Sequence, residues 1–321
     1  FADWLKRFPE SPLAPEVGLA VIRAYQQERN WSEAAAECER WLARHSDHAL
    51  RPWAEFERAR ATARLGQDAQ AFALFTNFTA RFPTDARAPW AQQWVADYHF
   101  NHQRYDQAEL DYQKLFQSTN WPVSELTYLA RLNAGRAAYH RQGYSAARGY
   151  YTNLLNDAAC PASLQPEVWF ELGNTLMEDR PVGATNLLAN YVEAIAAYSK
   201  IPQGFTNSPF VPLAWGQIGD CQLQLGSADP RQYDLALESY RTALKAEGAD
   251  VTSRSAAQVG LATVLQRKAE TAAAADRLML IREAQNAHLA VVTGAVLRAG
   301  EVSDALWVAR AAEAGARLAE Q

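Results

Sequence analysis

The sequence has 321 residues, of which 49% are hydrophobic, and its formal net charge at pH 7 is −5. This mild negative charge, with both signs mixed along the chain, argues against nucleic-acid binding. No apolar run reaches the roughly eighteen residues that a membrane span needs, so we expect none. The three cysteines, Cys38, Cys160 and Cys221, have no paired short spacing and are interpreted as small buried or idle thiols.

The chain begins with the pattern of a helix end. Apolar residues recur at helical spacing and a proline then ends the pattern, at Phe1, Trp4, Leu5, Phe8 and Pro9. Residues 1–9 are therefore interpreted as the end of a truncated preceding repeat. On this interpretation, the chain is an excised or matured piece of a longer protein.

Helical hairpins follow at a regular interval. The second helix of each hairpin opens with an alanine, and in most hairpins an aromatic residue stands four positions later. The alanines are Ala34, Ala71, Ala108, Ala147, Ala194, Ala236 and Ala284. Most first helices also carry a small residue, such as Ala96 or Gly219. Small residues let two helices approach closely, and the aromatic side chain fills the adjacent gap.

These hairpins resemble the tetratricopeptide repeat (TPR), whose small–aromatic–small pattern is carried by Trp215, Ile218, Gly219, Ala236, Tyr240, Ala243 and Leu244. The resemblance extends over residues 10–315. It implies an all-α fold, a right-handed α-solenoid (superhelix) of about seven TPR-like hairpins with a C-terminal capping helix. We expect residues 1–321 to form one solenoid, with repeats at 10–46, 47–83, 84–122, 123–160, 161–204, 205–247 and 248–296, and the capping helix at 297–321.

Several junctions depart from the regular spacing. Loops are expected at residues 156–166 and 202–212, and extra residues lie around 227–230. In the fifth repeat, residues 180–183 are expected to break the first helix, and residues 185–191 to start the second one early. Residues 268–279 are rich in alanine, which predicts longer helices in the seventh repeat rather than a loop.

Two junctions share the order Phe-Pro, short polar linker, Ala-Pro, at residues 8–15 and 82–89. The first proline ends one helix, and the second suits the first turn of the next helix. This junction is similar to that of bacterial cell-envelope TPR proteins, such as the periplasmic protein that works with the Tol–Pal system and the outer-membrane assembly lipoproteins. The resemblance favours a periplasmic or envelope-associated location and leaves a cytoplasmic one open.

In the TPR family, ligands bind a groove lined by the first helices. The position directly after the small residue of each first helix is occupied here by Arg23, Arg60, Asp97, Arg136, Asn174, Asp220 and Leu261. With neighbouring positions and two tryptophans on the same side, the resemblance implies a partner-binding groove of Arg23, Trp53, Phe56, Arg60, Trp90, Asp97, Phe100, Arg136, Tyr139, Phe170 and Asn174.

Arginines interleaved with aromatic residues suit an extended or helical peptide that carries acidic groups. Arginine pairs with carboxylates, and aromatic rings supply desolvated contact area. The alternative is that these arginines form a solvated surface and that the tryptophans pack between repeats. The family's carboxylate clamp for chaperone tails needs paired Lys and Asn residues, and only Asn174 matches, so that activity is not expected.

The sequence contains no catalytic signature. It has no Gly-rich phosphate loop, no G-x-S-x-G elbow and no H-E-x-x-H helix. His99 and His102 are close enough in sequence to share a metal, but the repeat places no third ligand near them, and a hydrogen-bonding pair is the favoured interpretation. We therefore predict no cofactor, no metal and no enzymatic activity.

The sequence favours a non-catalytic scaffold that binds a peptide or partner-protein segment, within a larger complex. One alternative is a purely structural spacer or arm of an envelope or secretion assembly. Another is a supporting region of a multidomain protein whose catalytic part lies outside this chain.

Overall fold

The computed structural model describes residues 2–179 and 188–319, and every regular element within these ranges is a helix, sixteen in all. This confirms the all-α fold class. The chain divides into two compact units, unit 1 at Phe1–Gly143 and unit 2 at Tyr144–Gln321. Each unit is described by itself. The expected repeat limits, and their assignment to a single solenoid, stay a prediction.

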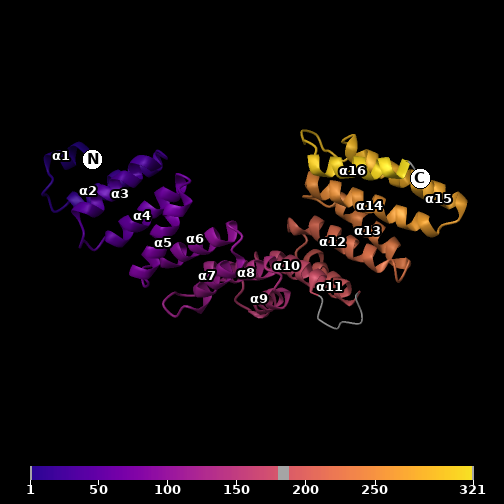
Figure 1. Ribbon diagram of the computed structural model, residues 1–321, viewed down its shortest axis with the longest axis horizontal. Coiled ribbons are helices and arrows are strands. Elements are labelled where there is room, and N and C mark those ends of the chain that lie inside the picture. The colour runs from indigo at the N-terminus through magenta and orange to yellow at the C-terminus, as the bar shows by residue number, and fades with distance from the viewer. Residues whose placement is uncertain (1, 180–187, 320–321) are drawn as a thin grey trace. The chain divides into compact units, whose positions relative to one another are not determined.

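Unit 1 is a series of antiparallel helices in which each helix packs against the next (Figure 1). The helices are α1 (Ala2–Arg7), α2 (Ala14–Gln27), α3 (Trp31–Arg44), α4 (Arg51–Arg64), α5 (Asp68–Arg81), α6 (Ala88–Asn101), α7 (Tyr105–Gln117) and α8 (Glu125–His140). Prolines occupy the first turns of α2, α4 and α6, where the missing N–H costs no helical hydrogen bond.

Unit 2 continues the same hairpin order (Figure 1). Its helices are α9 (Tyr144–Asn156), α10 (Gln165–Glu178), α11 (Ala189–Gly204), α12 (Phe210–Leu225), α13 (Arg231–Lys245), α14 (Val251–Thr271), α15 (Ala274–Val292) and α16 (Ala305–Ala319). In addition, α10 contacts α12, α12 contacts α14 and α14 contacts α16, so these alternate helices lie side by side. None of the helices in the two described ranges is both long and apolar enough to cross a membrane.

The irregular junctions match the predictions from the sequence in part. The alanine-rich residues 268–279 extend α14 and α15, as predicted. The expected loop at 202–212 is shorter, because α11 continues through Pro202 to Gly204 and α12 begins at Phe210. Pro202 lacks the N–H of one helical hydrogen bond, yet the helix continues to Gly204 and Phe205 N–H bonds to Ile201 O. The expected break at 180–183, and the early helix start as far as residue 187, lie outside the described residues.

The repeated alanines form the centre of both units. All seven, from Ala34 to Ala284, have no exposed surface. The residue four positions after each alanine is also buried, and in four of the seven hairpins it is a tyrosine. A Cβ built on Gly173 would lie 2.4 Å from the Tyr198 ring. The first helix therefore needs a residue without a side chain at that position for the tyrosine to fit.

Tyr240 makes the same contact on two sides. A Cβ built on Gly219 of α12 would lie 2.8 Å from its ring, and one built on Gly260 of α14 would lie 2.4 Å from it. The ring is thus enclosed between two consecutive first helices. This contact joins the hairpin α12–α13 to the hairpin α14–α15.

The hairpin turns of unit 1 share one backbone conformation. A positive φ between 56° and 73° occurs at Arg29, Gly66, Gln103 and Gln142. The residue after each donates its N–H to the carbonyl five positions earlier, as from Asn30 N to Tyr25 O at 2.8 Å. This Schellman arrangement gives a hydrogen-bond donor to carbonyls that would otherwise lack one at the helix end.

Gly66→Ala is expected to lower the unfolding free energy by about 1 kcal/mol. A Cβ at Gly66 would meet no atom within 4 Å, so the cost comes from the left-handed backbone alone. The matched control is Gly149→Ala, because Gly149 is exposed in helix α9 and also has free space. This change should raise the unfolding free energy by roughly 0.5–1 kcal/mol. Urea denaturation followed by circular dichroism measures both, and equal effects of the two substitutions would contradict the turn conformation.

Candidate functional site

The first helices of the hairpins contact one another in both units, and we call the surface that they form the first-helix face. In unit 1 these helices are α2, α4, α6 and α8, and in unit 2 they are α10, α12 and α14. All eleven residues predicted for the partner-binding groove come from these helices. The structure shows which of them contact other groups of the same unit.

Arg23 and Trp53 lie together at the start of unit 1. The guanidinium carbon of the exposed Arg23 lies 5.1 Å from the centroid of the Trp53 ring, a cation–π distance. Within the described part of the chain, no acidic side chain lies at ion-pair distance from Arg23. Its charge is therefore accessible to an incoming acidic group.

Arg60 is held by groups of its own unit. Its Nη2 donates to Glu57 Oε2 at 2.6 Å and to Gln26 Oε1 at 3.1 Å, and Gln26 Nε2 donates to Glu57 Oε2 at 2.8 Å. Glu57 is buried, so its ion pair with Arg60 offsets the cost of burying the carboxylate. These contacts connect α2 to α4 and leave Arg60 less available to a partner than Arg23.

The two aromatic candidates Phe56 and Trp90 have different environments. Phe56 packs edge-on against Phe75 and Phe78, with ring centroids 5.6 and 5.5 Å apart, and belongs to the core of its hairpin. Trp90 is 59% exposed in the first turn of α6. Phe56 therefore serves packing, whereas Trp90 offers a large apolar surface on the first-helix face.

A cavity of about 430 Å³ lies on this face of unit 1, between α6, α7 and α8, and we call it the unit 1 cavity. Its lining residues are Asp97, Phe100, Asn101, Tyr112, Asn133, Arg136 and His140. Three of them, Asp97, Phe100 and Arg136, are predicted groove residues, and the predicted Tyr139 packs edge-on against the adjacent His140 ring at 5.6 Å. The cavity thus combines an acid, a cation, two amides and aromatic rings, a lining that suits a polar segment with some apolar contact.

One hydrogen bond recurs in three hairpins. The tyrosine hydroxyl of the second helix donates to the residue directly after the small residue of the first helix. The pairs are Tyr112 with Asp97 Oδ1 at 2.6 Å, Tyr198 with Asn174 Oδ1 at 2.7 Å, and Tyr240 with Asp220 Oδ1 at 2.6 Å. The predicted residues Asp97 and Asn174 therefore have a structural partner within their own hairpin.

Phe170 also takes part in packing within unit 2. Its ring centroid lies 5.6 Å from that of Tyr198 and 5.4 Å from that of Phe210, so it contacts both α11 and α12. Together with the Asn174 contact, this places the two predicted groove residues of unit 2 mainly in contacts between helices.

A second cavity, of about 230 Å³, lies on the first-helix face of unit 2 between α12 and α14, and we call it the unit 2 cavity. Asp220 and Tyr240 line it, as Asp97 and Tyr112 line the unit 1 cavity. The other lining residues are Pro212, Leu213, Gly216, Gln217, Leu223, Ser253, Ala256, Ala257, Val259, Gly260, Thr263 and Trp307 of α16. Asp220 is the single charged side chain of this lining.

Burial raises the pKa of both cavity aspartates. For Asp97, hydrogen bonds from Tyr112 and Gln93 oppose the effect of burial but do not cancel it. For Asp220, burial raises the pKa from 3.8 to about 6, against the hydrogen bond from Tyr240. The pKa values of Tyr112 and Tyr240 are raised by burial and by the adjacent aspartate, so both hydroxyls remain donors at neutral pH.

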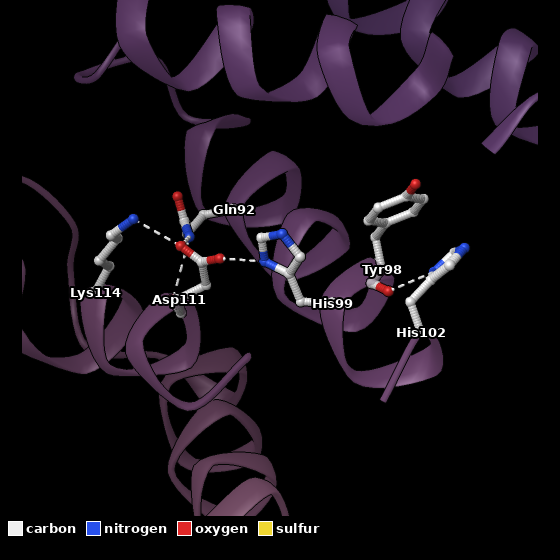
Figure 2. Close-up of polar contacts among 6 residues, drawn as sticks. All are labelled: Gln92, Tyr98, His99, His102, Asp111 and Lys114. Atoms are coloured by element: carbon white, nitrogen blue, oxygen red, sulfur yellow. Dashed lines mark hydrogen bonds and ion pairs between the residues drawn. The ribbon is translucent and has the colours of Figure 1, made fainter. Parts of the chain in front are cut away.

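His99 makes a polar contact between α6 and α7 (Figure 2). Its Nδ1 lies 2.7 Å from Asp111 Oδ2, and Asp111 Oδ1 accepts from Lys114 Nζ at 2.6 Å and from Gln92 Nε2 at 3.2 Å. Asp111 is only 5% exposed. Three donors thus surround one buried carboxylate, an arrangement that compensates its desolvation and fastens the two helices of this hairpin.

The structure does not bring His99 and His102 to a common ligand site. His102 Nδ1 lies 2.8 Å from Tyr98 O, separate from the His99 contact (Figure 2). Among the described residues, no group of three or more His, Cys, Asp or Glu side chains could hold a metal ion. The three cysteines are buried and free, and burial raises the pKa of Cys38 and Cys221 to about 12, which keeps these thiols protonated.

The sequence prediction missed part of both cavities. Asn101, Asn133 and His140 of the unit 1 cavity were not identified, nor were Ser253, Thr263 and Trp307 of the unit 2 cavity. The repeat pattern marks positions that face a neighbouring first helix, but it does not show where the facing side chains leave a cavity between them. The nearest signal is the pair Gly216 and Gly260, which both line the unit 2 cavity.

Comparisons with known proteins identify the fold. No family model matches the sequence, and no curated protein matches it either. The C-terminal part of a TPR repeat-containing protein from Cytophaga hutchinsonii is similar in structure, with a TM-score of 0.59 and 14% identity over 85% of this chain and 94% of that chain. A STAND signal transduction ATPase with a tetratricopeptide repeat sensor, from Pyrococcus horikoshii, gives a TM-score of 0.50 and 13% identity over 99% of this chain and 51% of that chain.

Asp111→Ala is expected to lower the unfolding free energy by about 1–3 kcal/mol, because it leaves His99 without its partner and weakens the contacts of Gln92. Asp106→Ala on the same helix is the control, since the Asp106 side chain is 84% exposed. The control should change the unfolding free energy by less than about 0.5 kcal/mol. Thermal unfolding of both variants tests this, and a fully stable Asp111→Ala protein would show that the His99 contact is incidental.

Asp220→Asn is expected to make the protein more stable than the wild type at pH 7, by up to about 3 kcal/mol. A carboxyl whose pKa rises on folding binds its proton more tightly in the folded state. The wild type therefore loses stability as the pH rises from about 4 to about 6, and the variant lacks this loss. Urea denaturation at pH 4, 5, 6 and 7 should show the stability difference growing to a plateau. A difference that shrinks over this range would contradict a carboxyl whose pKa is raised in the folded state.

Proposed function

We propose that this chain, which has the tetratricopeptide-repeat fold, is a non-catalytic scaffold that binds a segment of a partner protein on its first-helix face. The observation that carries this proposal is the unit 1 cavity. It is open on that face, and it presents Asp97, Asn133 and Arg136 beside aromatic rings. A site that offers both hydrogen-bond donors and hydrogen-bond acceptors can position a polypeptide segment through its side chains and backbone.

Accessible groups next to this cavity extend the proposed contact surface. Trp90 is exposed at the start of α6, and Arg23 lies over Trp53 at the start of the unit. Tryptophan and arginine are the residue types that contribute most often to binding energy at protein interfaces. The charge of Arg23 favours a partner segment with at least one acidic group.

The polar contacts of these helices are structural. The carboxylates Asp97 and Asp220 accept hydrogen bonds from tyrosines, and Glu57 is paired with Arg60. His99 is oriented by Asp111, as in a catalytic dyad, but the described residues bring no nucleophilic side chain into hydrogen bond with it. These groups hold helices together, and none is poised next to a reactive partner.

A purely structural role is the second candidate. Apolar side chains are exposed around the last helices, with Leu289 at 55% and Leu306 at 57%, and a cavity of about 450 Å³ lies between α15 and α16. Such a surface suits a spacer or arm that docks through its end. The Phe-Pro and Ala-Pro junctions support an envelope-associated setting for either role.

Selection of a random peptide library on the purified protein tests the first candidate. Peptides that bind the wild type are then measured by fluorescence polarisation against Arg23→Gln/Arg136→Gln and against the control Arg40→Gln/Arg44→Gln. The control residues lie on α3, a second helix. We expect at least a tenfold loss of affinity for the first variant and less than a twofold loss for the control. Equal binding to both variants would favour the structural role.

A further inference from the structure

The unit 2 cavity contains a carboxylate without a counter-charge. Asp220 is the single charged group of its lining, whereas Arg136 lines the unit 1 cavity together with Asp97. Over residues 2–179 and 188–319, no Lys, Arg or His side chain lies within ion-pair distance of Asp220. A partly buried carboxylate without a neighbouring cation costs free energy, and a ligand that brings a cation lowers this cost.

The position of this carboxylate is fixed by Tyr240. The tyrosine hydroxyl donates to Asp220 Oδ1 at 2.6 Å, and the ring is enclosed by Gly219 and Gly260. One carboxylate oxygen is therefore occupied, and the other remains for a further donor. Because Tyr240 is fully buried and holds this hydrogen bond, a ligand would meet a carboxylate that is already oriented.

The remaining lining suits the other parts of a long cationic side chain. Ser253 and Thr263 line opposite ends of the α14 wall of the cavity, and Thr263 Oγ1 donates to Val259 O at 3.0 Å. Pro212, Leu213 and Trp307 supply apolar walls. A cavity of about 230 Å³ accommodates a chain of four methylene groups with one ammonium group.

We propose that the unit 2 cavity binds a lysine side chain of the partner segment, with its ammonium group on Asp220 and its methylene groups against Pro212, Leu213 and Trp307. This inference rests on the proposed function, which supplies the partner segment. Lysine fits better than arginine, because a guanidinium binds best to two carboxylate oxygens and one of these is occupied by Tyr240. An ammonium group is a compact charge, and one of its N–H groups can donate to the free Asp220 oxygen.

The ionisation of Asp220 gives this binding a pH dependence. Burial raises its pKa to about 6, so acidification neutralises the carboxylate in a range where a primary ammonium stays charged. The other titratable groups nearby are Tyr240 of α13 and Cys221 of α12, and both are protonated at these pH values. Arg310 of α16 lies over the Trp307 ring, with its guanidinium carbon 4.9 Å from the ring centroid, and forms no ion pair with Asp220.

The experiment is a titration of the whole chain with n-butylammonium chloride at pH 7.5 and constant ionic strength. The readout is the indole N–H signal of Trp307 in a ¹H–¹⁵N correlation spectrum, assigned with Trp307→Phe. We expect a saturable shift with a dissociation constant on the order of 1–10 mM. At pH 5 the affinity should fall roughly tenfold, because about a tenth of Asp220 then remains ionised.

The test variant is Asp220→Asn, and the control is Asp276→Asn, a change at an exposed aspartate of α15 outside both cavities. Asn174 already accepts the tyrosine hydroxyl in another hairpin, so an asparagine at position 220 should keep the Tyr240 contact and the fold. The circular dichroism spectrum checks this. We expect Asp220→Asn to weaken n-butylammonium binding at least tenfold and Asp276→Asn to leave it unchanged.

Three outcomes would overturn the proposal: no saturable shift of the Trp307 signal, equal binding to Asp220→Asn, or equal binding of n-butanol or n-butylguanidinium. These outcomes are separate from the peptide selection described above. If the cavity binds no ammonium while selected peptides still depend on Arg23 and Arg136, the lysine inference alone fails. If n-butylammonium binds while no peptide is selected, the proposed scaffold function fails and the cavity is an ammonium site of another origin.

Discussion

The contact on which the structure depends is the insertion of a second-helix side chain against a small residue of the first helix. Tyr198 lies against Gly173, and Tyr240 lies against both Gly219 and Gly260. Close packing of this kind transmits any added volume directly to the backbone, so each hairpin tolerates little change at these positions. Because Tyr240 contacts two consecutive first helices, the same contact also sets the spacing between hairpins.

The sequence predicts this packing well, because it depends on local spacing. The seven alanines from Ala34 to Ala284 occur once in each hairpin, and all seven are fully buried. The longer helices α14 and α15 follow from an alanine-rich segment for the same reason. A loop is expected from Pro202, but α11 continues through it to Gly204, because the missing N–H removes only one hydrogen bond of the helix.

The site is less predictable, because it depends on contacts between residues far apart in sequence. Arg60 was expected to meet a ligand, but it pairs with Glu57 and with Gln26 of the preceding hairpin. Asp97 and Asn174 occupy the expected face and yet accept hydrogen bonds from tyrosines of their own hairpins. A residue's position on a helix therefore indicates its side of the unit, whereas its availability is decided by the partner opposite.

The tyrosine acceptor is an aspartate in two hairpins and an asparagine in a third, with nearly equal hydrogen-bond lengths. Asparagine and aspartate have almost the same shape, and one nitrogen in place of one oxygen removes a full negative charge. A single such exchange can therefore change the electrostatic potential of one hairpin while the packing of the neighbouring hairpins stays the same. In a repeat protein, this separates the evolution of ligand preference from the evolution of the scaffold.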